Sequence, residues 1–376
     1  MNDVGLKYTH HKTKGIIMKK GRFTFLAALA ALTLVGCGGS NVSSIISSSY
    51  EPEPEPEDNT VDVFVLSGQS NMEGSTMWKY PGANGAHLLE DYLEERGDVD
   101  VDGVMNGIPE VLTSYYGFYY PNKWGNAHSS STDQSSPEAR MTPNFQPTKV
   151  GMGVGDTYKG EKDIFFGPEL GIASTLREYA NEDNPIHLIK CAFSGSGFHK
   201  NDGPNWLNRD ENPDKSLFYL LKTYTHSCLE AIEETGKQPV LRGFVWHQGE
   251  SDSGSNTYAE EMKQLINDFK TEFADYALDG DTDNVAFLDC TIYDGSKRTY
   301  GANPAVNAQK LSIANESEDD LNFIVDGSFN TPDGLKLEIG DDANGGFNTY
   351  HYNTSDAFRL GEAYGQIMID NNLIKE

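Results

Sequence analysis

The chain has 376 residues, 37% of them hydrophobic, which is enough for one large folded domain or two ordinary ones. Its formal net charge is -28, with 57 acidic residues against 29 Lys and Arg. This excess of negative charge repels phosphate groups, so it argues against a nucleic-acid partner and is typical of a soluble, secreted surface.

Residues 1–36 are predicted to be an N-terminal extension and a signal peptide. Met18-Lys19-Lys20-Gly21-Arg22 is basic, and the apolar run 23–35 after it is too short to span a bilayer. The polar residues before Met18 fit no leader pattern, which favours Met18 as the start. Leu34-Val35-Gly36-Cys37 resembles the lipobox of bacterial lipoproteins. We therefore expect a lipid anchor on Cys37 and an extracytoplasmic place in a bacterial cell envelope. A plain secretory signal with an incidental cysteine is the alternative.

Residues 37–60 are predicted to form a tether. A Ser-rich run is followed by alternating Pro and Glu over 51–58, a composition that favours extended polyproline II and self-repulsion. Beyond Cys37 only three cysteines remain, and each lies in an apolar run. Cys191, Cys228 and Cys290 are therefore expected to be buried thiols rather than a disulfide framework.

From residue 61 to 376 strands and helices alternate, which predicts one domain built of βαβ units around a mostly parallel sheet. The expected strands are Val61–Ser67, Ile186–Ala192, Val240–Trp246, Val285–Cys290 and Phe323–Val325. The expected helices are Pro168–Tyr179, Ser216–Glu234, Tyr258–Tyr276, Ala305–Ala314 and Thr354–Ile369.

The region of about 75–165 departs from this rhythm. It is rich in Gly, Ser and Pro and contains an aromatic run over residues 114–124, so it is predicted to be an irregular insertion. Its Tyr and Trp rings could stack on sugars or form a small core of the insertion itself. The sequence leaves both interpretations open.

Polar motifs follow three of the expected strands. Val63–Leu66 is a buried strand that runs into Ser67-Gly68-Gln69-Ser70-Asn71, and a serine in such a turn is a candidate nucleophile. Ser194-Gly195-Ser196-Gly197 follows the second strand, where small residues allow a substrate to approach the backbone. His247-Gln248-Gly249-Glu250 ends the third strand, and a late block with His351 precedes the last helix.

Two of these motifs, Gly-Gln-Ser-Asn-Met-x-Gly and Trp-x-Gln-Gly-Glu-x-Asp, together with a late histidine, resemble the SGNH (GDSL-like) hydrolases. The closest branch is that of the sialate O-acetylesterases and the acetylxylan esterases of carbohydrate esterase family six. The resemblance runs from about Val61 to the last helix and covers 75–165 poorly. It implies a three-layer α/β/α sandwich of the flavodoxin-like type.

The resemblance also implies roles for individual residues in ester hydrolysis. Ser70 is the expected nucleophile and His351 the expected base, since an imidazole with a pKa of about 6.5 can both take and return a proton. The oxyanion is expected to be bound by the backbone N–H groups of Ser70 and Gly195 and by the Gln248 side-chain amide.

The triad acid is the weak point of the pattern. Many SGNH hydrolases have an aspartate three residues before the histidine, but this chain has Asn348 there. An asparagine accepts a hydrogen bond but cannot stabilise an imidazolium by charge. Members of this branch can use the carboxylate of Gln-Gly-Glu, so Glu250 is the first candidate. Asp341 or Asp342, or a Ser–His dyad without an acid, are the alternatives.

Four further residues are candidates for substrate binding: Gln69, Asn71, His199 and Trp206. Gln69 and Asn71 could equally hold the turn. No His/Cys/Asp cluster has metal-ligand spacing, so no metal or other cofactor is expected.

The sequence thus predicts a serine esterase that removes O-acetyl groups from carbohydrates. Acetylated xylan or its oligosaccharides are the first choice of substrate, and O-acetyl sialic acid is the second. Two other interpretations remain: a cell-surface glycan-binding lipoprotein without activity, and a lipase or thioesterase of the wider superfamily. The oligomeric state is not predicted.

Overall fold

The structure is a computed structural model that describes residues 58–79, 88–119, 127–153, 163–199, 203–294, 304–316, 321–327 and 351–375. The predicted signal peptide, Cys37 and nearly all of the tether lie outside these residues, as do Asp341, Asp342 and Asn348. No helix among the described residues has the length and apolar character needed to cross a membrane.

The core of the fold is a mostly parallel sheet with the strand order β10-β9-β8-β1-β7-β3-β4, in which β5 also pairs with β3. Six of the described strands run parallel to one another: β10, β9, β8, β1, β7 and β3. Strands β4 and β5 are antiparallel to β3. The bounds are β1 (Thr60–Gly68), β3 (Ile108–Tyr119), β4 (His128–Ser129), β5 (Gln146–Thr148), β7 (Ile186–Ser194), β8 (Gln238–His247), β9 (Ala286–Cys290) and β10 (Asn322–Val325). A separate antiparallel pair consists of β2 (Thr76–Met77) and β6 (Phe165–Phe166).

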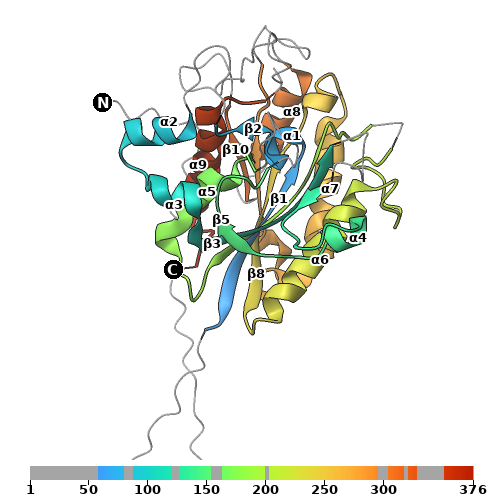
Figure 1. Cartoon of the computed structure of the whole chain (residues 1–376). Coiled ribbons are helices and arrows are strands. Elements are labelled where there is room, and N and C mark those ends of the chain that lie inside the picture. The colour runs from blue at the N-terminus through green and yellow to red at the C-terminus, as the bar shows by residue number, and fades with distance from the viewer. Residues whose placement is uncertain are drawn as a thin grey trace, which may run out of the picture. The chain divides into compact units, whose positions relative to one another are not determined.

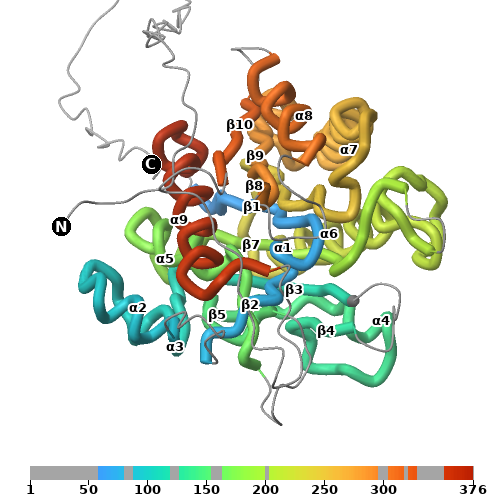
Figure 2. The backbone as a smooth tube through the Cα atoms, turned by 90° about the horizontal axis from the view of Figure 1, so that it is seen from above, coloured from blue at the N-terminus to red at the C-terminus, as the bar shows by residue number. Residues whose placement is uncertain are grey.

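Helices cover both faces of the sheet, as Figures 1 and 2 show. One face packs against α2 (Leu89–Arg96), α3 (Val101–Asn106), α5 (Glu169–Leu176) and α9 (Thr354–Asp370). The other packs against α6 (Leu217–Glu233), α7 (Tyr258–Glu272) and α8 (Ala305–Ala314). Two short helices, α1 (Ser70–Glu73) and α4 (Pro137–Arg140), complete the described set. The expected three-layer α/β/α sandwich is thus confirmed.

Strand β1 lies in the middle of the sheet and is buried on both sides. Phe64 and Leu66 belong to the hydrophobic core under α5 and α9, while Val63 and Val65 belong to the core under α6 and α7. Burial of both faces explains why this strand is a continuous apolar run rather than an alternating one. The thiols of Cys191, Cys228 and Cys290 are free and buried, as expected.

The region 75–165 is more ordered than its composition predicts. Its residues Ile108–Tyr119 form β3, which pairs in parallel with β7 over nine residues of register and so belongs to the central sheet. Tyr116 and Phe118 pack against Phe193 in the main core, with ring centroids 6.2 and 4.6 Å away. These two rings therefore belong to the core of the whole domain, a role that neither interpretation of the sequence predicts. Tyr120 and Trp124 of the same aromatic run lie outside the described residues.

Candidate active site

The three motifs meet because the strands that carry them are neighbours. Strand β1 lies between β7 and β8, and its last residue, Gly68, is in register with Ala192 on one side and His247 on the other. Since parallel strands end at the same edge, the segments that follow them are brought together there. Ser70, Gly195 and Glu250 each lie within three residues of one of these strand ends.

The turn that carries Ser70 depends on a glycine. Gly68 has φ +141°, and a Cβ atom at this position would lie 2.1 Å from the His247 carbonyl oxygen. The next residue, Gln69, donates its backbone N–H to that same oxygen at 3.0 Å. The chain then begins α1 with Ser70, which is 7% exposed. The glycine thus lets β1 pack tightly on β8 just before the candidate nucleophile.

His351 is held near this turn by its neighbour Tyr352. The backbone N–H of Tyr352 donates to Asn71 Oδ1 at 3.2 Å, and its carbonyl accepts from Thr76 Oγ1 at 2.9 Å. Its phenol OH lies 3.1 Å from His247 Nε2. Beyond it, Asn353 caps α9 by accepting the Asp356 N–H at 2.8 Å. The residue after His351 and the serine motif are therefore linked by direct hydrogen bonds.

The Glu250 carboxylate is buried beside both segments. Its Oε1 accepts a hydrogen bond from Asn71 Nδ2 at 2.7 Å and lies 3.6 Å from His247 Nε2. Its Oε2 is buried and has no hydrogen-bond partner among the described residues. Burial acts to raise the pKa of Glu250, but the nearby His247 and the hydrogen bond from Asn71 outweigh it and lower the pKa. The carboxylate is therefore ionised at neutral pH.

The imidazole of His351 is neutral under the same conditions. Burial lowers its pKa to about 4, while the negative charges of Glu250 and Glu73 act in the opposite direction. Its Nδ1 is buried and makes no hydrogen bond within the described part of the chain. A neutral imidazole can accept a proton from a serine, and Glu250 is close enough to act on it electrostatically. Glu250 therefore acts on His351 electrostatically, and a triad of these two residues with Ser70 stays a prediction.

Comparison with known proteins identifies the family of this chain. The sequence profile of the SASA family, described as "carbohydrate esterase, sialic acid-specific acetylesterase", matches residues 136–370, which is 235 of the 376 residues. The chain belongs to this family. The matched segment contains Glu250 and His351, whereas Ser70 precedes it. A search of curated protein sequences gave no match.

Two solved structures share the fold of this SASA-family protein. NanS is 13% identical with a TM-score of 0.53, and the match covers 84% of this chain and 98% of NanS. A protein from Arabidopsis thaliana is 17% identical with a TM-score of 0.50, and the match covers 83% of this chain and 99% of that one.

The Gln248 side chain is fully buried in the SASA-family domain, and both its nitrogen and its oxygen are hydrogen-bonded within the protein. Its amide nitrogen donates to Asp252 Oδ2 at 2.7 Å and to the Ser196 carbonyl at 3.3 Å, and its oxygen accepts from the Tyr258 hydroxyl at 3.1 Å. In this arrangement the amide holds the glycine-rich loop after β7. A direct bond from Gln248 to an oxyanion stays a prediction.

Asp252, the last residue of the second motif, has a role that the sequence does not predict. Its Oδ2 also accepts the Phe198 N–H at 3.0 Å, so it joins the loop after β8 to the loop after β7. A Cβ atom on Gly197 would lie 2.9 Å from this oxygen, which explains a glycine there. Burial raises the pKa of Asp252, against the hydrogen bonds from Phe198 and Gln248.

The candidate substrate-binding residues differ in their placement. Gln69 Oε1 accepts the Ser251 N–H at 3.2 Å, and the Asn71 amide is used by Glu250 and Tyr352, so both hold the turn together. Trp206 is 0% exposed and donates its indole N–H to Ser196 Oγ at 3.0 Å, which places it in the core behind the loop. The more exposed His199 pairs with Glu261. A substrate contact by any of the four stays a prediction.

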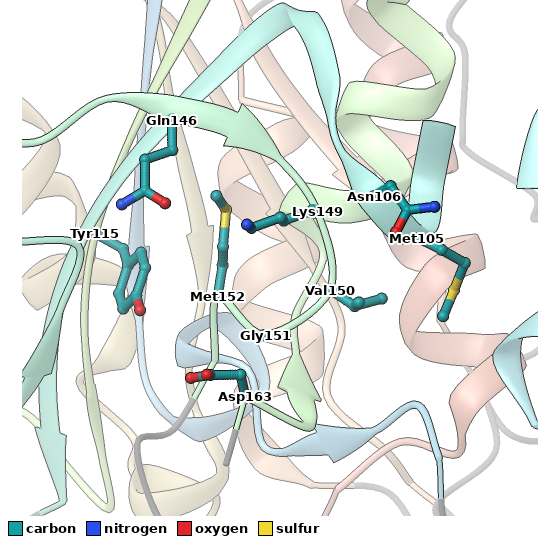
Figure 3. Close-up of a pocket in the computed structure, with 9 residues that line it drawn as sticks. All are labelled: Met105, Asn106, Tyr115, Gln146, Lys149, Val150, Gly151, Met152 and Asp163. Carbon is teal, nitrogen blue, oxygen red and sulfur yellow. The ribbon is translucent and has the colours of Figure 1, made fainter. Parts of the chain in front are cut away.

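Within the described residues, no group of three or more His, Cys, Asp or Glu side chains is arranged to hold a metal ion. A cavity of about 360 Å³ lies beside α3, β3 and β5 and is lined by Tyr115, Gln146, Lys149, Met152 and Asp163 among others (Figure 3). The candidate triad residues do not line it.

Proposed function

We propose that the protein is a serine esterase that removes O-acetyl groups from carbohydrates through an acetyl-enzyme on Ser70. The observation that carries this proposal is that Asn71, next to Ser70, is hydrogen-bonded both to the ionised Glu250 carboxylate and to Tyr352, next to the neutral His351. Membership of a carbohydrate esterase family supports it. The fold and this juxtaposition also favour catalysis over simple glycan binding, because binding alone does not require a buried neutral imidazole beside a carboxylate.

In the first half of the reaction, Ser70 Oγ forms a bond to the acetyl carbonyl carbon as its proton passes to His351. The negative charge on the carbonyl oxygen is stabilised by the backbone N–H groups of Ser70 and Gly195. The bond between that carbon and the sugar oxygen then breaks, and the leaving sugar oxygen takes the proton from His351 and becomes a hydroxyl. Glu250 Oε2 accepts a hydrogen bond from the Nδ1–H of the imidazolium and stabilises its charge, without itself becoming protonated.

In the second half, a water molecule attacks the acetyl-enzyme while His351 removes one of its protons. Acetate leaves, and the proton returns to Ser70 Oγ. Glu250 Oε2 and His351 Nδ1 are both buried and have no hydrogen-bond partner among the described residues. They are therefore available to each other when the imidazole becomes charged in either half of the reaction. Catalytic hydrogen bonds often tighten only when substrate is bound.

The first choice of substrate remains acetylated xylan or its oligosaccharides, on the motifs that resemble acetylxylan esterases. O-acetyl sialic acid is the second candidate, and the description of the matching family favours it. Both are acetyl esters of sugar hydroxyls, so the same chemistry serves either.

The test is acetate release from acetylated xylan, mannan, pectin and O-acetyl sialosides by the parent and by Ser70→Ala. We expect release by the parent and loss of at least about 1,000-fold in the variant. The control is Ser227→Ala, which removes a hydroxyl on α6 that donates to the Thr223 carbonyl at 3.1 Å, and it should keep the parental rate. A parent that releases no acetate, or a Ser70→Ala variant as fast as the parent, would overturn the proposal.

A further inference from the structure

Glu73 is a buried acid at the end of the nucleophile helix. It is the last residue of α1, three positions after Ser70, and it is 1% exposed. The sequence alone gives no reason for a glutamate to be buried there. A buried carboxylate costs several kcal/mol of solvation free energy unless donors surround it, so its partners indicate what it does.

The carboxylate of Glu73 contacts residues of two strands, β7 and β4. Its Oε2 accepts the Ser194 backbone N–H at 2.8 Å and also the Ser194 hydroxyl. Its Oε1 lies 2.6 Å from His128 Nε2 on β4. One carboxylate therefore links the nucleophile helix to the end of β7 and to β4.

The surrounding residues are fitted to this link. A Cβ atom on Gly117 of β3 would lie 3.0 Å from Glu73 Oε1 and 2.5 Å from the Ala192 carbonyl oxygen, so the glycine leaves room for the carboxylate. The buried Lys190 amine donates to the Glu73 carbonyl at 3.1 Å and pairs with Glu169 at 2.9 Å. The backbone and side chain of Glu73 are thus both fixed.

Ser194 immediately precedes Gly195, whose N–H is a proposed oxyanion donor. Gly195 has φ +72°, a conformation that glycine adopts without strain. A donor acts on the transition state only when it lies at hydrogen-bond distance from the developing oxyanion. The position of Ser194 relative to Ser70 therefore controls this geometry, and Glu73 sets that position.

We propose that Glu73 is a positioning residue that fixes Ser194, and through it the Gly195 N–H, relative to Ser70. This inference rests on the proposed esterase function. Since Glu73 holds a donor aimed at the transition state, its loss lowers kcat and leaves KM nearly unchanged. Its charge also acts on His351, so removing it shifts the acid limb of the pH profile to lower pH.

The experiment compares Glu73→Ala and Glu73→Gln with the parent in acetyl ester hydrolysis. We expect kcat to fall about 100-fold in Glu73→Ala, as for a misplacement of about 1 Å. Glu73→Gln keeps an oxygen that can accept from Ser194, so it should recover a large part of the rate while the pH profile stays shifted. It also serves as the second variant if Glu73→Ala does not fold.

The matched control is Asp62→Ala. Asp62 is a buried acid near the other end of β1 that accepts from Arg242 Nε and from the Lys375 N–H, each at 2.6 Å. Its loss should lower the melting temperature and leave kcat at the parental value. A Glu73→Ala variant that folds and keeps the parental kcat, or loses no more than Asp62→Ala does, would overturn the inference.

Hydrogen exchange over residues 193–197 gives a readout that does not depend on activity. The Ser194 amide should exchange slowly in the parent and at least about 10-fold faster in Glu73→Ala, with no such change in Asp62→Ala. Unchanged exchange would contradict the positioning role. A parent without esterase activity but with this exchange pattern would overturn the proposed function and leave the link between Glu73 and Ser194 intact.

Discussion

Asn71 Nδ2 donates a hydrogen bond of 2.7 Å to Glu250 Oε1, and so joins the residue after the candidate nucleophile to the candidate acid 179 positions later. The same side chain accepts the Tyr352 N–H through its Oδ1. One asparagine thus sets the spacing between all three members of the candidate triad. The arrangement leaves Glu250 Oε2 buried and without a hydrogen-bond partner among the described residues.

Glu250→Gln should lower kcat by about 10⁴-fold, because an amide cannot stabilise the imidazolium by charge and the same change at the triad aspartate of serine proteases has an effect of this size. Asn348→Ala should cost less than about 10-fold. The comparison uses kcat on one acetyl ester at neutral pH. A severe loss from Asn348→Ala with a mild one from Glu250→Gln would transfer the role of orienting His351 away from Glu250.

The pH dependence of kcat/KM should show an acid limb at about pH 4. Burial lowers the pKa of His351 to about 4, so the imidazole is neutral and able to accept a proton at every higher pH up to neutrality. The measurement is the rate on an uncharged acetyl ester from about pH 3.5 to about pH 8, a range that brackets this pKa and the ordinary one of histidine. A limb centred above about pH 6 would show that the imidazole in the working enzyme is exposed to water.

Stability should fall as the pH drops from about 6.5 toward 4. Burial also lowers the pKa of His187 to about 4, so the unfolded chain binds a proton that the folded one excludes in this window. At the lower end each such histidine removes about 3 kcal/mol of unfolding free energy. His187→Gln should reduce the loss between about pH 7 and about pH 4.5, as measured by urea unfolding at both values. An unchanged difference would show that His187 is not the source.

Gly68→Ala should destabilise the domain by more than about 3 kcal/mol, because the new Cβ atom would lie 2.1 Å from the His247 carbonyl oxygen at a φ of +141°. Gly236→Ala is the matched control, since Gly236 has φ +84° but no atom within 4 Å of its added Cβ. That variant should lose only about 1 kcal/mol. Thermal unfolding of the two variants separates the cost of the close contact from the cost of the positive φ. Equal losses of unfolding free energy would argue against the close contact.

Much of this fold can be predicted from the sequence because most of its strands and helices have a clear hydrophobic pattern. The buried run of β1 and the amphipathic pattern of α6 are of this kind. Strand β3 escapes prediction because its sequence contains Pro109, Glu110 and Gly117 and lies among Gly- and Ser-rich segments. Its neighbour β7 and the core supply the stabilisation that local propensity does not.

Some features of the candidate site can likewise be predicted from the sequence, and others cannot. The order of the motifs is enough to bring Ser70 and Glu250 to one edge of the sheet, because parallel strands end together. The place of His351 depends instead on the hydrogen bonds of Tyr352 with Asn71 and Thr76. The pairing of Glu73 with Ser194, and of Asp252 with Phe198, cannot be predicted, since each depends on the register between segments far apart in the chain. The burial of Trp206 likewise depends on tertiary packing against Phe193 and Trp246.

The central place of β1 in the sheet has a consequence for how the protein is made. Its two neighbours, β7 and β8, begin more than 100 residues later in the chain, and the Tyr352 segment follows later still. Pairings this distant in sequence form slowly, because long loops must close before the contacts stabilise them. During synthesis β1 therefore cannot pair in the sheet until both of its neighbours have been made, and Ser70 is synthesised long before His351. A chain released before residue 351 would carry the candidate nucleophile without the candidate base, so it should show no hydrolysis.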